Sequence, residues 1–111
     1  MEKLNELTTL KMVEEFLENN EFSFLYISRP ECSTCHAILY KLRELLGHYP
    51  LIHLGHIDAN KVEEVAEKFL IFTVPIMLLM IDQKEYIRED RFVRFDRLKK
   101  KLDQIYDMYT R

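Results

Sequence analysis

The chain has 111 residues, 48% hydrophobic and 32% charged, which suits a single globular domain over residues 1–111 and excludes a disordered protein. Its formal net charge is −3 with both signs interspersed, which argues against binding to nucleic acid because such binding requires a basic face. The sequence has neither an apolar run long enough to span a membrane nor an apolar signal core at its start, so we expect a cytoplasmic protein without a membrane partner.

Helical and extended patterns alternate through the first half of the chain. Thr8-Thr9 can cap a helix with an apolar stripe, which ends at Asn19-Asn20. The β-branched and aromatic run at 22–27 predicts a strand. Apolar residues at steps of three and four then predict a helix with one buried face to about residue 46. Gly47 is predicted to end this helix in a left-handed conformation.

A further strand and helix are predicted in the middle of the chain. Residues 51–57 have the composition of a strand. Asn60 with Glu63 has the form of a capping box, and apolar residues up to Phe69 give the segment that follows a helical stripe. We therefore expect a third amphipathic helix after this strand.

The last third of the chain predicts two strands and a helix. Residues 76–81 are six apolar residues in a row, as expected of a strand covered on both faces. Residues 86–93 are strand-like but heavily charged, which places them near a sheet edge, and an amphipathic helix begins near Asp96. The predicted order αβαβαββα is typical of an α/β fold with a mostly parallel sheet between helices and an antiparallel pair at its end.

The only two cysteines, Cys32 and Cys35, are spaced as Cys-x-x-Cys where the strand at 22–27 passes into the following helix. The first N–H groups of a helix are unpaired and its dipole is positive there, so this position favours a thiolate over a thiol. The thiolate is the form that attacks disulfides. Because structural disulfides are rare in a reducing cytosol, we predict a redox pair or a metal site rather than a structural crosslink.

Two alternatives to a redox pair remain open at this point. His53 and His56 could complete a zinc site with the cysteines, although the spacing departs from that of zinc fingers and residues three apart in a strand point to opposite faces. Both cysteines could also be ordinary buried residues without chemistry. His36 and His48 are more typical of surface histidines than of metal ligands.

A strand, Cys-x-x-Cys, a helix and, about 40 residues later, Thr73-Val74-Pro75 before the strand at 76–81 together resemble the thioredoxin family over nearly the whole chain. The resemblance implies the thioredoxin fold, in which helices cover both faces of a central mixed sheet in a three-layer α/β/α arrangement. It also implies a thiol–disulfide oxidoreductase. The alternative function is a thioredoxin-fold module that binds proteins or senses redox state without turnover.

In the redox interpretation, Cys32 is the nucleophile because it is first in the pair and nearer to solvent, and Cys35, one helical turn later, is the resolving thiol. Cys32 attacks a disulfide of a protein or low-molecular-weight substrate to form a mixed disulfide, and Cys35 then releases the reduced substrate. This chemistry needs no metal and no organic cofactor. The expected electron donor is a thioredoxin reductase or a low-molecular-weight thiol.

Thr73, Val74 and Pro75 are predicted to form a substrate-binding loop. A proline that opens a central strand removes a donor from the ladder, which a cis Val74–Pro75 bond would explain. The alternative is a trans proline that merely starts a strand. The resemblance implies that this loop faces the cysteine pair and that the backbone of Val74 pairs with a bound substrate strand.

The motif departs from the usual Trp-Cys-Gly-Pro-Cys of thioredoxins, since Glu31 precedes the pair and the residues between the cysteines are Ser33 and Thr34. Hydroxyl and backbone donors from Ser33 and Thr34 would lower the pKa of the first thiol, and the charge of Glu31 would raise it. His36 follows the pair directly and is predicted to tune the second thiol or to contact a partner.

Two residues that handle protons in thioredoxins are also replaced. Tyr26 stands where thioredoxins carry a buried Asp, six residues before Cys32, and Leu54 stands where a Lys pairs with that Asp. The relay that would take the proton from Cys35 is therefore absent, reduced to the phenol of Tyr26, or replaced by water. These departures predict a specialised partner or an altered reduction potential rather than a general thioredoxin.

Overall fold

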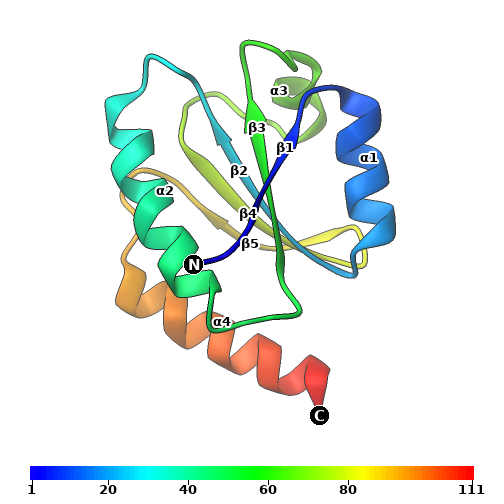
Figure 1. Cartoon of the computed structure of the whole chain (residues 1–111), viewed down its shortest axis with the longest axis vertical. Helices are drawn as coiled ribbons and strands as arrows, with labels where there is room; N and C mark the ends of the chain where they lie inside the picture. Colours follow the sequence, from blue (N-terminus) through cyan, green and yellow to red (C-terminus); the bar gives the residue numbers. More distant parts are fainter.

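The computed structural model describes all 111 residues, and four helices surround one five-stranded sheet. Figure 1 shows their arrangement. In chain order the elements are β1 (Leu4–Leu7), α1 (Leu10–Asn19), β2 (Phe22–Ser28), α2 (Ser33–Leu46), β3 (His53–Asp58), α3 (Glu64–Lys68), β4 (Ile76–Ile81), β5 (Lys84–Glu89) and α4 (Phe95–Thr110). Helices α1 and α3 cover one face of the sheet, and α2 and α4 cover the other, which gives three layers. None of these helices combines the length and the hydrophobicity that crossing a bilayer requires.

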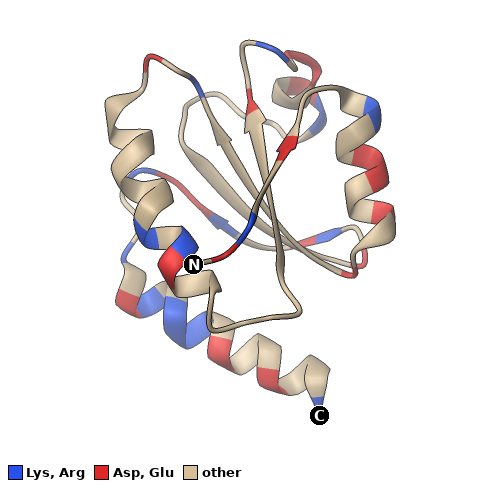
Figure 2. Ribbon diagram, viewed as in Figure 1, with Lys and Arg blue, Asp and Glu red and all other residues tan.

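The strands follow the order β1-β3-β2-β4-β5 across the sheet. β1, β3 and β2 run parallel, whereas β4 is antiparallel to β2 and β5 is antiparallel to β4, so the sheet is mixed as predicted. β2 and β4 are buried at every position and carry no charged residue, as Figure 2 shows. The charged strand β5 lies at one edge of the sheet, as predicted.

Alternation of side chains along the central strands divides the interior into two cores. Phe24 and Tyr26 of β2 pack with buried side chains of α2 and α4, whereas Leu25 and Ile27 pack with those of α1 and α3. Cys35 belongs to the first of these cores. The face of the sheet beneath α2 is therefore the face that supports the cysteine pair.

The predicted order αβαβαββα lacked the first strand. Leu4–Leu7 pairs in parallel with residues 54–57 of β3, so the observed order begins with β1, and the remaining elements follow as predicted. This strand has only four residues and no clear alternation of apolar and polar side chains. Pairing with β3 at the sheet edge, rather than local propensity, forms it.

The predicted end of α2 near residue 46 is correct, but two predicted helix caps were wrong. Gly47 has a φ of −59° and lies in the right-handed helical region, so α2 does not end in a left-handed glycine. The predicted capping box does not form, because Asn60 lies in the turn after β3 and its N–H donates to Oδ1 of Asp58. Helix α3 instead begins at Glu64 without a side-chain cap.

The other predicted limits were closer. Thr9 caps α1 as expected, with its hydroxyl accepting from the N–H of Met12 at 3.1 Å. β4 has the predicted limits 76–81, and β2 extends the predicted strand by one residue to Ser28. β3 begins two residues later than predicted, and β5 begins two residues earlier and ends at Glu89.

Gly55 in β3 lies at a close contact between the sheet, β1 and α1. A Cβ atom at this position would lie 2.7 Å from Cδ1 of Leu7, 3.0 Å from Cε2 of Phe16 and 3.3 Å from Cδ2 of Leu25. A close-packed core has no free space to absorb such contacts without shifting neighbours. The absence of a side chain at Gly55 therefore lets β1 and α1 close over β3.

We expect Gly55→Val to lower the free energy of unfolding by about 1–3 kcal/mol, because the added carbon atoms overpack this contact. Gly47→Ala is the control, since alanine adopts the φ of −59° found at Gly47, and its effect should stay within about 0.5 kcal/mol. Urea unfolding followed by far-ultraviolet circular dichroism measures both. Equal stability of Gly55→Val and the wild type would contradict the packing argument.

Candidate active site at the cysteine pair

Cys32 and Cys35 lie at the amino end of α2 and are joined by a disulfide, with their Cα atoms 5.3 Å apart. Cys32 is the N-cap residue, and its Sγ accepts a hydrogen bond of 3.2 Å from the backbone N–H of Cys35. Cys32 is half-buried, whereas Cys35 is 2% exposed and packs in the core. The sulfur nearer to solvent is thus also the one at the positive end of the helix dipole.

A tight turn connects β2 to the first cysteine. The N–H of Cys32 donates to the carbonyl oxygen of Arg29 at 3.1 Å and closes this turn. Glu31 is exposed, and its carboxylate accepts from Nδ2 of Asn60 at 3.1 Å. This bond holds the negative charge of Glu31 toward the loop that follows β3.

Ser33, Thr34 and His36 are exposed on the first turns of α2. The donor that reaches Sγ of Cys32 is the backbone N–H of Cys35, and neither hydroxyl makes a hydrogen bond in the disulfide form. A role of Ser33 and Thr34 in stabilising the thiolate therefore stays a prediction for the reduced form.

Tyr26 connects the sheet to the active-site helix. Its side chain is fully buried, and its hydroxyl donates a 2.6 Å hydrogen bond to the carbonyl oxygen of Cys35. Burial raises the pKa of the Tyr26 phenol above its usual range. The phenol therefore keeps its proton at neutral pH and acts as a fixed donor rather than as a base. Leu54 is also fully buried in this core and contributes apolar packing.

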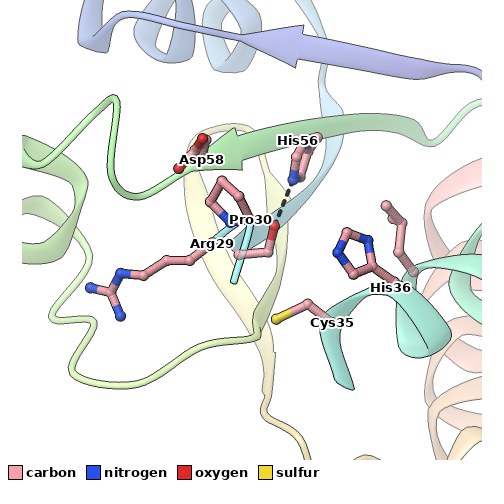
Figure 3. Close-up of a pocket in the computed structure, with 8 residues that line it drawn as sticks. Arg29, Pro30, Cys35, His36, His56 and Asp58 are labelled. Carbon is pink, nitrogen blue, oxygen red and sulfur yellow. Dashed lines mark hydrogen bonds between the residues drawn. The ribbon is translucent and has the colours of Figure 1, made fainter. Parts of the chain in front are cut away.

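A cavity of about 230 Å³ lies beside Cys35, between α2 and the carboxyl ends of β2 and β3, as Figure 3 shows. The residues that line it are Ser28, Arg29, Pro30, Cys35, His36, Leu39, His56 and Asp58. Neither Ser28 nor Asp58 was predicted as a site residue. Each is the last residue of its strand, and the carboxyl ends of neighbouring parallel strands meet at one edge, which is the signal that could have identified them.

His56 bonds through both of its ring nitrogens at the edge of this cavity. Nε2 lies 2.7 Å from Oγ of Ser28, and Nδ1 lies 2.8 Å from a carboxylate oxygen of Glu6. His53 is exposed and lies on the opposite face of β3. No three His, Cys, Asp or Glu side chains are grouped as ligands of a metal ion, so the zinc site considered above is not assembled.

The loop Thr73-Val74-Pro75 enters β4 next to the carboxyl end of β2, because Ile76 pairs with Ile27. The Val74–Pro75 peptide bond is cis, as predicted. Thr73 is exposed and Val74 is half-buried, and the N–H and C=O groups of residues 72–74 make no backbone hydrogen bonds within the chain. These groups are therefore free to pair with an added strand.

Comparison with known proteins relates the whole chain to one group of proteins, although no protein-family model matches it. The thioredoxin-like protein YdfQ of Bacillus subtilis is 49% identical over 109 residues, which cover 98% of this chain and 97% of the relative. A solved thioredoxin from Trypanosoma brucei brucei has a TM-score of 0.81 at 14% identity and covers 95% of this chain and 92% of its own. Thioredoxin O2 from Arabidopsis thaliana in the oxidized state has a TM-score of 0.81 at 19% identity, with 93% and 94% covered. These structures confirm the predicted thioredoxin fold.

Burial of Tyr26 makes the stability of the protein depend on pH in the alkaline range. In the unfolded chain the phenol ionises above about pH 10, whereas the raised pKa keeps it protonated in the folded state. The folded state then binds more protons, so its stability falls as pH rises. We expect Tyr26→Phe to reduce this slope by up to about 1.4 kcal/mol per pH unit.

Urea unfolding between pH 9 and 11 measures this slope. Tyr40→Phe, which removes an exposed phenol, is the matched control and should leave the slope unchanged. An equal slope in Tyr26→Phe and in the wild type would show that Tyr26 does ionise in the folded protein.

Proposed function

The chain belongs to the thioredoxin family, and we propose that it works as a thiol–disulfide oxidoreductase through the Cys32–Cys35 pair. The observation that carries this proposal is the half-buried residue Cys32 at the amino end of α2, one turn from the buried Cys35 with which it forms a disulfide. One accessible sulfur and one protected sulfur are what a two-step exchange requires.

In the first step, the reduced Cys32 acts as a thiolate. The N–H of Cys35, which donates to Sγ of Cys32, and the positive end of α2 favour the negative charge. The thiolate attacks one sulfur of a substrate disulfide, the substrate S–S bond breaks, and the second substrate sulfur leaves as a thiolate. The product is a mixed disulfide between Cys32 and the substrate.

In the second step, Cys35 loses its proton and attacks Sγ of Cys32. The mixed disulfide breaks, the substrate leaves as a thiolate, and the Cys32–Cys35 disulfide forms. Two electrons have then moved from the protein to the substrate. A thioredoxin reductase or a low-molecular-weight thiol supplies two electrons to restore the dithiol.

The proposal uses sulfur chemistry alone, so it includes no metal and no organic cofactor. The substrates are proteins or small molecules that contain a disulfide. We assign the reaction to the cytoplasm, where a reducing environment keeps the pair in the dithiol form between turnovers.

The loop Thr73-Val74-Pro75 is the proposed binding site for the substrate chain. Its N–H and C=O groups have no backbone partners within the protein, and the register of β4 places it beside the end of β2 that leads to Cys32. An extended substrate segment can add its own N–H and C=O groups to Val74 in the manner of a sheet edge. Such pairing positions the substrate disulfide through backbone hydrogen bonds alone, so binding does not depend on the side chains of the substrate.

We expect Cys32→Ser to reduce insulin-disulfide reduction by dithiothreitol to the uncatalysed rate, because no thiolate remains to attack. Cys35→Ser should instead retain the attack and accumulate mixed disulfides, which non-reducing electrophoresis and mass spectrometry detect. Iodoacetamide should alkylate Cys32 in the reduced wild type faster than it alkylates a free cysteine at neutral pH.

The same measurements separate turnover from a binding or redox-sensing role. If the wild type reduces insulin no faster than dithiothreitol alone and Cys32 alkylates at the rate of a free cysteine, the protein is a binding module. In that case the Cys35→Ser variant also captures no mixed disulfide from a cell lysate.

The proposed pairing with Val74 predicts that substrates need a backbone N–H at one particular place. A single N-methyl group is moved along a short peptide that carries a mixed disulfide, and kcat/KM is measured for each peptide. We expect a fall of about five- to tenfold at one or two positions next to the cysteine, as for a lost hydrogen bond of about 1 kcal/mol, and little change elsewhere. A uniform rate along the peptide would contradict pairing at the loop.

A further inference from the structure

Three polar side chains from three adjacent strands form a continuous hydrogen-bonded chain beside the cysteine pair. Glu6 of β1 and His56 of β3 are opposite each other in the parallel register, and their side chains meet with 2.8 Å between the carboxylate oxygen and Nδ1. Nε2 of His56 then bonds to Oγ of Ser28, at the end of β2, at 2.7 Å. The dashed line in Figure 3 marks this second bond.

The order of these bonds fixes where the protons lie. A carboxylate only accepts hydrogen bonds, so Nδ1 of a neutral His56 carries the hydrogen and donates it to Glu6. Nε2 is then the acceptor, and the hydroxyl of Ser28 donates to it. The lone pairs of Oγ of Ser28 remain available to accept a proton from the cavity that Ser28 lines.

Cys35 lines the same cavity as Ser28 and His56, and Figure 3 shows its side chain beside α2. The volume of the cavity, about 230 Å³, is enough for several water molecules. A water held between Cys35 and Ser28 would complete a path from the thiol to the imidazole. Imidazole is the side chain that exchanges a proton most readily near neutral pH.

The other titratable or charged groups around His56 are less suited to take this proton. The phenol of Tyr26 has a raised pKa and is committed to the carbonyl of Cys35. Oδ1 of Asp58 accepts from the N–H of Asn60, and Figure 3 shows the guanidinium of Arg29 directed away from His56. The remaining group, His36, is exposed and makes no hydrogen bond that orients its ring.

We propose that Glu6, His56 and Ser28 form a proton relay that serves Cys35 in the second step of the exchange, an inference that rests on the proposed function. The proton of the Cys35 thiol passes through water to Oγ of Ser28 while the hydroxyl proton of Ser28 passes to Nε2 of His56. The resulting imidazolium is held by the carboxylate of Glu6. The Cys35 thiolate forms the S–S bond to Cys32, the bond from Cys32 to the substrate breaks, and the substrate thiolate takes up a proton from the imidazolium through water.

Serine, histidine and a carboxylate in this order also occur in hydrolases, where the histidine deprotonates the serine for attack on a substrate. Here Ser28 is only 6% exposed, and the reactive group that shares its cavity is the thiol of Cys35. The geometry therefore assigns the relay to the thiol rather than to hydrolysis.

Stopped-flow reaction of the reduced protein with 5,5′-dithiobis(2-nitrobenzoate) separates the two steps. The first equivalent of thionitrobenzoate reports the attack by Cys32, and the second reports the attack by Cys35 on the mixed disulfide. We expect His56→Gln to slow the second phase by about 10²-fold near neutral pH, with the first phase unchanged within twofold. Added imidazole should restore the second phase in His56→Ala, which leaves space for it.

Matched variants control for effects on folding and on other histidines. His53→Gln changes an exposed histidine on the opposite face of the same strand and should leave both phases unchanged. Glu6→Gln alters a side chain that is 56% exposed, so it should fold normally and still slow the second phase. In His56→Gln and Glu6→Gln, the rate of the second phase should rise in proportion to hydroxide concentration. In the wild type, this rate should level off as pH rises.

A second phase in His56→Gln and Glu6→Gln that matches the wild type across the pH range would overturn the relay, and so would a loss confined to His36→Gln. These outcomes leave the first phase intact and spare the proposed function. Absence of a fast first phase in the wild type would instead overturn the oxidoreductase itself.

Discussion

Cys32 is the N-cap of α2, and this position brings its Sγ within hydrogen-bond distance of the backbone N–H of Cys35. At that position the N–H of Cys35 is shared between the carbonyl oxygen and Sγ of Cys32, each at 3.2 Å. The cap is held in place by β2, which is buried at all seven positions, and by the turn that Cys32 closes with Arg29. The same two cysteines in a free loop would have neither a fixed separation nor an oriented donor.

The phenol at position 26 changes what the core contributes to the second cysteine. A buried carboxylate there would accept the proton of Cys35, whereas Tyr26 donates to the carbonyl of Cys35 and keeps its own proton. The gain is structural, because a short buried hydrogen bond fastens α2 to the middle of the sheet. In the proposed exchange the base for Cys35 is therefore a group other than Tyr26, and the cavity that Cys35 lines also contains Ser28 and His56.

Sequence patterns predicted the features whose physical cause lies within a few residues. Six consecutive apolar residues identified β4, and the steps of three and four identified α2 with Cys32 at its start. β1 was missed because its pairing partner in β3 is about 50 residues away. Glu6, Ser28 and His56 were not recognised as a group for the same reason, since only the parallel register of three strands brings them together.

The contact between Glu6 and His56 gives β1 a role that sheet stability does not explain. The Glu6 side chain is 56% exposed, and a contact with so exposed a carboxylate contributes at most about 1 kcal/mol to folding. The ladder to β3 and the packing of Leu7 around Gly55 hold the strand without that contact. The carboxylate of Glu6 instead fixes the tautomer of the imidazole. The hydrogen is on Nδ1, and Nε2 is directed to Ser28 and the cavity. A contact with little effect on stability can therefore be the one that orients the base we propose for Cys35.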